Sequence, residues 1–384
     1  MRIGIDARLY GTASGTGIGR YTEELLRALA AVDTANTYVV FLQRDGFVAF
    51  TPPNARWSKI LADFRPYTLA VQTRFPRLLR QQHLDLMHFT HFDHPVRCPV
   101  PFITTVHDLI LLRYPSIRAS TLGSLRFWMK YLAYRTVLRH VARHSIRICT
   151  PSQTVADDVH GMLRVSKERI AVTPLGVDHG GIENGELRID NSESNIIHSP
   201  FAIRNFFLYI GNAYPHKNLE QLVRVWPTVI EAHPDLQLII VGRADDFTER
   251  LQTLVGDRTP IVFMGVVDDA TRRSLLVSAH AYISPSRCEG FDLPTVEALA
   301  AGTPVIASDI PVHREILNNG ALFFPVDDDR ACTEAIHRIL IDNALRATLE
   351  QRGRTVAAEY HWHSCAIRTF NAYREAIASR GTAP

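Results

Sequence analysis

The stretch SRCEGFDLPTVEALAAGTPVIASD, Ser286–Asp309, holds the pattern that decides the fold. It follows an apolar, strand-like run at Ala281–Ser284 and passes through an alanine-rich helical segment into a second apolar run, Pro304–Ala307. Pro294 suits the first turn of that helix, where its missing N–H is not needed. A strand, a helix and a second strand in this order predict two strands of one parallel sheet.

The same alternation extends on both sides of this stretch, over residues 205–361. Apolar runs alternate with helical patterns, which predicts a parallel sheet covered by helices on both faces. Such sheets bind ligands beyond the carboxyl ends of their strands. The expected strands are Phe206–Ile210, Leu236–Val241, Ile261–Phe263, Ala281–Ser284, Pro304–Ala307 and Ala321–Phe324.

The first half of the chain suggests the same architecture. A β-branched run at Arg2–Asp6 leads into a glycine-rich turn, Gly11–Gly19, and then into an amphipathic helical pattern over Tyr21–Ala31. We therefore predict an α/β chain of two Rossmann-like, doubly wound parallel-sheet domains that face a cleft. The other strands expected here are Tyr38–Leu42, Leu86–Phe89, Phe102–Val106, Ile146–Thr150 and Ile170–Thr173.

The predicted domains are residues 1–180 and residues 205–361. Residues 181–204 between them are polar, rich in Gly, Asn and Ser and nearly without periodicity, which is typical of a linker or an excursion loop. A C-terminal helix over about residues 362–384 is expected to pack back on the first domain. A length of 384 residues suits this two-domain division.

Composition narrows the class of protein. The chain is 46% hydrophobic and 21% charged, as globular proteins are, and has no uncharged apolar run of about 18 residues that would span a membrane. The start of the chain lacks the features of a signal peptide. Five cysteines, far apart and without a C-x-x-C pair, indicate reduced thiols, a cytoplasmic location and no metal site.

Charge is spread unevenly along the chain. Residues 1–180 hold 23 Lys/Arg and 13 Asp/Glu, a balance of +10, whereas the remainder holds 19 and 26, a balance of −7. This asymmetry favours different partners for the two halves, although chance variation on solvated faces explains it as well. The chain has no nucleic-acid-binding motif and a pI of only about 8.6, which excludes nucleic acid as a partner.

Two loops that follow predicted strands are candidates for binding phosphate. Gly17 and Gly19 precede Arg20 after the first strand, and glycines there let backbone N–H groups approach a phosphate. Their spacing is not the dinucleotide fingerprint, so a plain tight turn remains an alternative. The second loop, GNAYPHKN, Gly211–Asn218, brings the cation of Lys217 to a strand-to-helix junction, where a plain surface lysine is the alternative.

The third candidate is EGFDLPTVE, Glu289–Glu297. Gly290–Leu293 would present backbone N–H groups at a helix start, where the helix dipole favours a diphosphate. Glu289 and Glu297 flank this spot, and carboxylates accept charge-assisted hydrogen bonds from sugar hydroxyls. For a single glutamate, a residue favoured by the helix dipole is the alternative interpretation.

These motifs in order resemble the family 4 glycosyltransferases, which are retaining enzymes of the GT-B fold. The resemblance rests on the two glutamates eight positions apart in E-G-F-x-L-P-x-x-E and on the AGTPVIASD that follows, and it spans nearly the whole chain. Five further matches support it. They are TGIGRY, VHDL (Val106–Leu109), TPSQ (Thr150–Gln153), PLGVD (Pro174–Asp178) and the GN…HKN loop (Gly211–Asn218).

The resemblance implies three catalytic residues. Glu289 would bind a hydroxyl of the donor sugar near its 3-position, and Lys217 would neutralise the leaving phosphate. His107 would lie near the 6-position and the reacting centre. Glu297 would bind the ribose hydroxyls of the nucleotide. The remaining donor-binding residues would be Gly17, Gly19, Arg20, Asn212, Gly290, Phe291, Asp292 and Leu293.

The chain departs from the family pattern at two positions. Asn212 stands where many members have an arginine, so Arg243 or His216 is expected to assist Lys217 unless Lys217 acts with less help. Asp292 replaces the glycine of E-G-F-G-L-P, and its side chain is expected to point away from the diphosphate. No carboxylate pair reads as a metal site, because Asp327–Asp329 is typical of a turn and a helix cap.

The resemblance also implies the reaction: a metal-independent transfer of a hexose from a nucleotide sugar, with retention and no cofactor. TGIGRY together with HKN and DIPVHRE is most similar to bacterial mannosyl- or rhamnosyltransferases of polysaccharide and lipopolysaccharide assembly, which favours GDP-mannose. A dTDP- or UDP-sugar that donates rhamnose, glucose or N-acetylglucosamine is the alternative. A non-catalytic nucleotide-sugar-binding scaffold would be expected to lack Glu289 or Lys217.

The expected acceptor is a glycan or a polyprenyl-linked saccharide. The helical pattern Thr121–Arg147 carries an apolar stripe beside a basic one, which suits peripheral contact with an anionic membrane at the inner face of the cytoplasmic membrane. An ordinary helix with a solvated basic face is the alternative. The apolar stripe is Phe127, Tyr131, Tyr134, Leu138 and Val141, and the basic stripe is Arg135, Arg139, Arg143 and Arg147.

Overall fold

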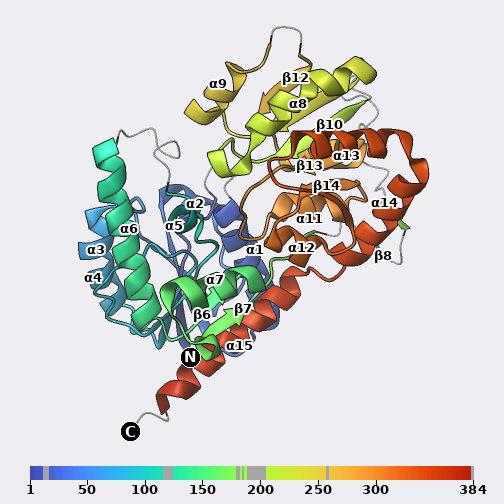
Figure 1. Cartoon of the computed structure of the whole chain (residues 1–384). Helices are drawn as coiled ribbons and strands as arrows, with labels where there is room; N and C mark the ends of the chain where they lie inside the picture. Colours follow the sequence, from blue (N-terminus) through green and yellow to red (C-terminus); the bar gives the residue numbers. More distant parts are fainter. Residues whose placement is uncertain are drawn as a thin grey trace. The chain divides into compact units, whose positions relative to one another are not determined.

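The computed structural model of the chain describes residues 1–11, 17–115, 124–178, 182–183, 186–187, 205–256 and 259–381. It divides into two compact units (Figure 1). The first unit is Met1–Gly176 with His361–Pro384, and the second is Val177–Tyr360. The predicted connecting segment 181–204 lies outside the described residues, except for the strands β8 (Ile182–Glu183) and β9 (Glu186–Leu187).

The described part of the first unit holds one seven-stranded parallel sheet, ordered β3-β2-β1-β4-β5-β6-β7. Its strands are mostly buried, as expected for a sheet with helices on both faces. The strands are β1 (Arg2–Asp6), β2 (Thr37–Leu42), β3 (Trp57–Leu61), β4 (Leu86–Phe89), β5 (Phe102–Thr105), β6 (Ile148–Thr150) and β7 (Ile170–Val172).

The helices of the first unit connect these strands, and the last helix of the chain joins them. That last helix, α15, packs against α1 and β7. The helices are α1 (Gly17–Val32), α2 (Arg44–Ala49), α3 (Leu69–Thr73), α4 (Phe75–Arg80), α5 (Ile110–Arg113), α6 (Ser124–His144), α7 (Gln153–Leu163) and α15 (Trp362–Gly381), with the 3₁₀ turn η2 (Lys167–Arg169).

The second unit holds a six-stranded parallel sheet in its described residues, ordered β12-β11-β10-β13-β14-β15. This is the order of a dinucleotide-binding fold, with the topological switch point between β10 and β13. The strands are β10 (Phe206–Ile210), β11 (Gln237–Val241), β12 (Ile261–Gly265), β13 (Ala281–Ser284), β14 (Val305–Ser308) and β15 (Ala321–Phe324). The two sheets confirm the predicted pair of doubly wound α/β domains.

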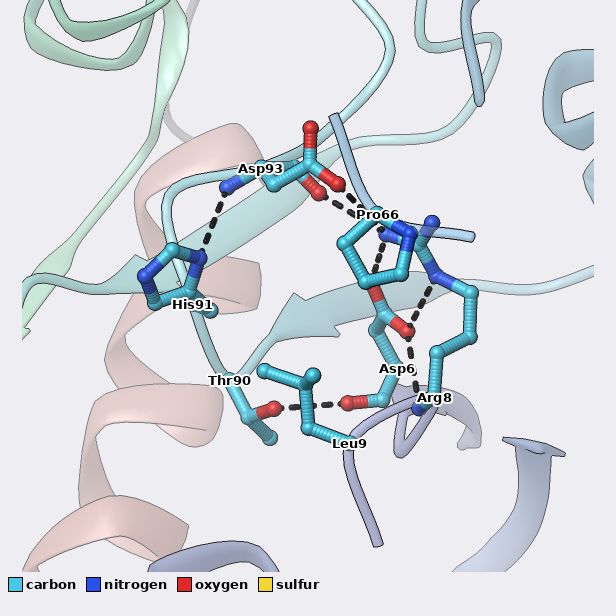
Figure 2. A pocket seen from close by; sticks show the side chains of 7 residues that line it. All are labelled: Asp6, Arg8, Leu9, Pro66, Thr90, His91 and Asp93. Carbon is cyan, nitrogen blue, oxygen red and sulfur yellow. Dashed lines mark hydrogen bonds and ion pairs between the residues drawn. The ribbon is translucent and has the colours of Figure 1, made fainter. Parts of the chain in front are cut away.

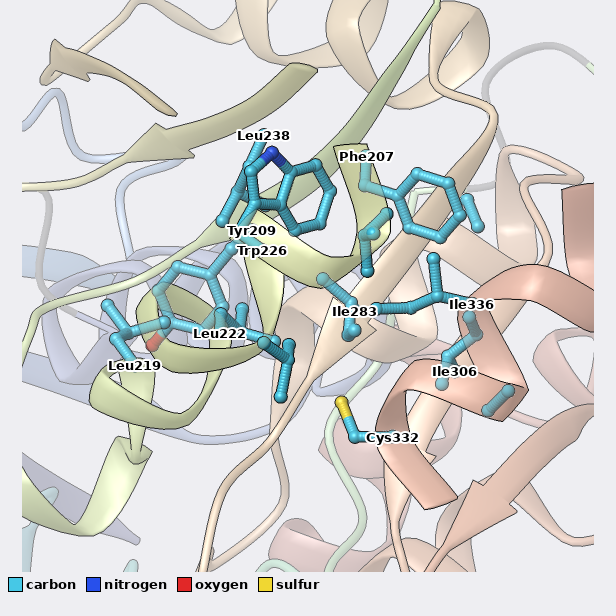
Figure 3. Packing of buried hydrophobic residues seen from close by; sticks show 14 of the residues in the cluster. Phe207, Tyr209, Leu219, Leu222, Trp226, Leu238, Ile283, Ile306, Cys332 and Ile336 are labelled. Carbon is cyan, nitrogen blue, oxygen red and sulfur yellow. The ribbon is translucent and has the colours of Figure 1, made fainter. Parts of the chain in front are cut away.

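The helices of the second unit bury apolar side chains against this sheet. Figure 3 shows Trp226, Phe207 and Ile283 gathered in the resulting core, where all three are fully buried. The helices are α8 (Leu219–Ala232), α9 (Asp246–Gln252), α10 (Asp269–Ser278), α11 (Leu293–Ala300), α12 (Pro311–Leu317), α13 (Asp329–Ile341) and α14 (Asn343–Ala357), with the 3₁₀ turn η4 (Pro215–Lys217).

The structure corrects the sequence prediction at the start of α1. The helix was expected from Tyr21 but begins at Gly17, so Gly17 and Gly19 lie in its first turn instead of in a preceding loop. Residues 12–16 of the predicted glycine turn are outside the described part of the chain. The first N–H groups of a helix lack partners within it, so the first turn of α1 still offers backbone donors.

The apolar stripe of α6 also differs from its expected use. Phe127, Leu138 and Val141 are buried, and Leu138 and Val141 belong to a core cluster with residues of α7 and β6. The stripe therefore packs inward and is not available to a membrane. The apolar side chains that α6 does expose are Trp128, Met129 and Leu132, at 48%, 65% and 61%.

Candidate active site

The carboxyl ends of β10 and β13 bring Lys217 and Glu289 together. Lys217 lies in η4 after β10, and Glu289 lies in the loop after β13, the neighbouring strand. The Nζ atom of Lys217 donates to Oε1 of Glu289 at 2.6 Å, and both side chains are largely buried. A buried pair that comes from two segments 72 residues apart fixes both loops at the switch point of the sheet.

Several hydrogen bonds hold the turn that carries Lys217. Asn218 directly follows Lys217 in the left-handed conformation (φ 57°), which asparagine tolerates. Its Nδ2 donates to the Pro285 carbonyl and to the Asp327 carboxylate at 3.1 Å each. The backbone N–H of Arg287 donates to the His216 carbonyl at 2.7 Å. The turn and the loop after β13 are thus tied to each other independently of the Lys217–Glu289 pair.

Carboxylates keep Lys217 charged. Burial by itself would lower the pKa of Lys217, but Glu289, Tyr209 and Asp292 raise it above its ordinary value. The ammonium therefore remains protonated across the physiological range, as a group that stabilises a leaving phosphate requires.

Asp292 turns into the interior of the second unit. It precedes α11 in the left-handed conformation (φ 59°) and does not cap the helix with its side chain. Its Oδ2 accepts from Ser284 Oγ at 2.7 Å and lies 3.0 Å from His313 Nε2. Burial opposes ionisation, but the hydrogen bond with His313 and the charge of Lys217 lower the pKa of Asp292 below its ordinary value.

Glu297 lies on α11 and forms an ion pair with a residue of α10. Arg272 Nη1 donates to Glu297 Oε2 at 2.6 Å, and Arg272 also pairs with Asp269 one turn earlier on its own helix. The pair fixes the direction of the Glu297 carboxylate at the first helical turn after the loop Glu289–Asp292, which we call the donor loop. Sequence reasoning did not identify Arg272, because no local pattern connects positions 25 residues apart.

The other predicted residues of the second unit lie along the same sheet edge. Gly290 and Phe291 lie between Glu289 and α11, Leu293 is the first residue of that helix, and Phe291 packs edge-on against Tyr360. Asn212 follows β10, and its carbonyl accepts a hydrogen bond from the Tyr209 hydroxyl. The structure therefore brings the predicted donor-binding residues of this unit to one edge of one sheet.

His107 follows β5 in the first unit. Its Nε2 lies 2.8 Å from the Thr90 carbonyl, and since a carbonyl only accepts, Nε2 carries the hydrogen and Nδ1 is left as an acceptor. Burial lowers the pKa of His107 to about 4. The imidazole is therefore neutral at pH 7. Tyr21 of α1 packs edge-on against the His107 ring. The other predicted residues of this unit are on the same helix: Gly17 and Gly19 lie in the first turn of α1, and Arg20 directly precedes Tyr21.

A buried charge cluster at the carboxyl ends of β1 and β4 was not predicted. Arg8 donates to both carboxylate oxygens of Asp6, at 2.9 and 2.8 Å, and to the Asp93 carbonyl at 2.9 Å (Figure 2). With Thr90 and His91 these residues line a small pocket. Two short patterns in the sequence belong to this cluster: D-x-R at Asp6–Arg8, at the end of β1, and H-F-D at His91–Asp93, after β4. Neither becomes informative until the two strands are known to be neighbours.

The described residues contain no group of three or more His, Cys, Asp or Glu side chains that could hold a metal ion. Asp327 pairs with Arg287, and Asp328 caps α13 by accepting from the Ala331 N–H, so the predicted turn and helix cap are confirmed. Every helix in the described residues is too short or too polar to span a bilayer.

Comparison with known proteins defines the class. Residues 15–180 match a family model described as Glycosyltransferase Family 4, and residues 193–356 match one described as Glycosyl transferases group 1. With two doubly wound domains, these matches define a glycosyltransferase of the GT-B fold. The chain belongs to the family 4 glycosyltransferases, as the resemblance of its motifs implied.

Curated relatives and solved structures agree with this assignment. An O-antigen chain mannosyltransferase of Salmonella typhimurium is 28% identical over 85% of this chain and 88% of its own length. A phosphatidyl-myo-inositol mannosyltransferase of Mycobacterium leprae is 35% identical over 59% of this chain and 62% of its own. An Anabaena protein solved in complex with UDP and glucose has the same fold, with a TM-score of 0.73, at 16% identity over 97% of this chain and 99% of that one.

Proposed function

We propose that this protein transfers mannose from GDP-mannose, with retention at the anomeric carbon, to a glycan or lipid-linked saccharide of a cell-surface polysaccharide. The observation that carries the proposal is the buried Lys217–Glu289 pair at the switch point of the second sheet, beside the start of α11. The mannosyltransferases among the relatives support mannose as the sugar. A UDP- or dTDP-sugar donor remains the alternative that the experiment below tests.

The donor site follows from the chemistry of these groups. The diphosphate lies at the N-terminus of α11, where the helix dipole and first-turn N–H groups stabilise negative charge. Lys217 neutralises the leaving phosphate, Glu289 accepts a hydrogen bond from a sugar hydroxyl, and Glu297 binds the ribose. The charge that develops on the leaving group is thus met by a preorganised ammonium and backbone amides, so the transfer needs no metal ion.

Arg243 is a better candidate than His216 for the second cation of the phosphate site, which the arginine at the position of Asn212 supplies in many family members. Burial and the neighbouring ammonium of Lys217 lower the pKa of His216 to about 3, so His216 is neutral at pH 7. Arg243 follows β11, the strand beside β10, and arginine keeps its charge. Of the two side chains considered, only Arg243 brings a positive charge to this edge of the sheet.

The acceptor side belongs to the first unit. We assign acceptor hydroxyl groups to the pocket of Figure 2, at the carboxyl ends of the strands. Asp93 offers acceptor oxygens there, and His91, whose Nδ1 accepts from the Asp93 N–H, offers the hydrogen on its Nε2. Burial keeps His91 neutral by lowering its pKa, so it binds as a hydrogen-bonding group. His91→Ala is expected to raise the KM for the acceptor while the affinity for GDP stays the same. A loss of GDP affinity would contradict the assignment.

Peripheral membrane contact is proposed through the exposed side of α6. Trp128, Met129 and Leu132 are exposed on the same helix as Lys130 and Arg135, a combination suited to an anionic membrane surface. The double substitution Trp128→Ser/Leu132→Ser is expected to abolish pelleting with anionic liposomes. Equal pelleting of the natural chain with neutral and anionic liposomes would remove this part of the proposal.

One experiment tests the donor directly. Thermal unfolding in the presence of GDP, UDP or dTDP should single out GDP, because a ligand at about 100 times its dissociation constant adds about 2.7 kcal/mol of stability. Hydrolysis of GDP-mannose, with and without a lipid-linked acceptor, then separates an enzyme from a non-catalytic sugar-nucleotide scaffold. Stabilisation by UDP or dTDP but not GDP would overturn the choice of donor and leave the glycosyltransferase class in place.

A further inference from the structure

Asp292 adds a second carboxylate to the site where the donor diphosphate is proposed to bind. It is buried directly before α11, three residues after Glu289. Lys217 already balances the charge of Glu289 through their 2.6 Å contact. An uncompensated charge on Asp292 would repel a diphosphate at the same helix start, since electrostatic forces are strong at buried positions. A further group must therefore neutralise Asp292.

The contacts of His313 identify that group. Nδ1 of His313 lies 2.8 Å from the Ser308 carbonyl and 3.2 Å from Ser308 Oγ. The single hydroxyl hydrogen of Ser308 is donated to the Ser286 carbonyl, so neither atom of Ser308 donates to the imidazole. Nδ1 therefore carries a hydrogen of its own.

The second ring nitrogen needs a proton as well. Nε2 lies 3.0 Å from Asp292 Oδ2, and two facing lone pairs would repel each other. One proton must lie between the two atoms, so Asp292 and His313 together carry no net charge. Ser284 Oγ donates to the same carboxylate oxygen, which favours the ionised form of Asp292 and places the proton on His313.

We propose that His313 is a positioning residue for the donor: as an imidazolium it neutralises Asp292 and holds the donor loop on β13 and β14 without leaving a negative charge at the diphosphate. This inference rests on the proposed function, because it assumes that a nucleoside diphosphate binds at the start of α11. It also explains how Asp292 occupies a position that is glycine in the family motif. Its backbone adopts the left-handed conformation, while its side chain acts as an anchor.

The other titratable groups around the pair do not supply the missing charge. Lys217 from η4 and Glu289 from the loop after β13 are paired with each other. Tyr209 of β10 and Tyr282 of β13 face Asp292, and burial raises the pKa of both hydroxyls above its ordinary value, so both are neutral. The charge at this helix start therefore depends on the proton of His313.

The test is GDP affinity, measured by titration calorimetry on the full chain. His313→Ala is expected to weaken GDP binding by about tenfold or more, because Asp292 keeps its charge. The double variant Asp292→Gly/His313→Ala removes that charge as well and is expected to recover most of the loss. His337→Ala is the matched control, since His337 pairs with His233, the residue directly after α8, and not with the donor loop.

A structural role and a charge role for His313 predict different results. If His313 only fills space, the double variant binds GDP as weakly as His313→Ala or more weakly, and the proposal is overturned.

A measurement on the natural chain covers the case in which His313→Ala does not fold. Nitrogen-15 spectra of the His313 side chain at about pH 7 should show hydrogens on both ring nitrogens. A bare Nε2 would overturn the inference while leaving the proposed function intact. If the natural chain binds neither GDP, UDP nor dTDP, the proposed function itself fails, and the inference falls with it.

Discussion

Replacing Lys217 with alanine should separate its role in stability from its role in catalysis. The side chain of Glu289 is only 6% exposed and Lys217 Nζ lies 2.6 Å from it, so Lys217→Ala leaves a carboxylate buried without its ion-pair partner. Removal of one member of a buried pair costs about 3–5 kcal/mol. Because Lys217 is itself 19% exposed, we expect the lower end, about 3 kcal/mol.

The catalytic loss has a different origin. In the proposed mechanism the ammonium is the preorganised charge that meets the leaving phosphate, and losing such a contact lowers the rate by about 10²-fold or more, or about 2.7 kcal/mol. Glu289→Ala is expected to lower the rate by a similar factor, because it removes the contact that we propose with a hydroxyl of the donor sugar. Single-turnover transfer from GDP-mannose measures both rates, and urea unfolding measures both stabilities.

The double variant Lys217→Ala/Glu289→Gln makes the reasoning refutable. Glutamine is neutral, so unfolding free energy should recover by about 2 kcal/mol relative to Lys217→Ala. Transfer should stay at least about 10²-fold below the natural chain, because the ammonium is still missing. Near-normal turnover in Lys217→Ala or Glu289→Ala, or recovery of transfer in the double variant, would refute the assignment of this site.

Three further predictions follow from the geometry. Arg272→Ala should raise the KM for the donor by about tenfold with a smaller change in kcat, since it frees Glu297 without removing it. Arg287→Ala should lower kcat by about threefold to tenfold, because it removes the hydrogen bond to the Pro215 carbonyl and so loosens the turn that carries Lys217. Arg224→Ala is its control: it removes only an exposed ion pair with Asp329 and should leave kcat unchanged. Burial lowers the pKa of His88 to about 3, so as the pH falls His88 takes up a proton in the unfolded state before it does so in the folded state. The free energy of unfolding should therefore fall by about 2–5 kcal/mol as the pH drops from about 6.5 towards 3. A His88→Gln variant whose acid unfolding curve has the same slope would contradict this.

Local pattern was sufficient for most of the fold because the strands are short apolar runs with clear boundaries. The strand β3 (Trp57–Leu61) was missed because it lies at the edge of its sheet and is only half buried, so Ser58 and Lys59 interrupt the apolar run. The predicted start of α1 lies after the observed one, because the glycines in its first turn have low helix propensity. The rest of the helix stabilises these glycines in the helical conformation.

The site could be predicted only where the residues are close in sequence. Glu289 and Glu297 were found because they share one motif, and Lys217 because it follows a strand. The partners that set their charge and direction come from distant segments: Arg272 reaches Glu297 from another helix, and His313 reaches Asp292 across 21 positions. Such contacts depend on the order of strands in the sheet, which local periodicity does not contain.

The return of α15 to the first unit sets an order for folding during synthesis. Residues 177–360 form one continuous unit whose two ends meet, since the Val177 N–H donates to the Tyr360 carbonyl. The first unit instead needs Tyr373, which is fully buried and hydrogen-bonded to His88. The ribosome must therefore release the last helix before the N-terminal sheet can close its core, and the unit that starts second can finish first.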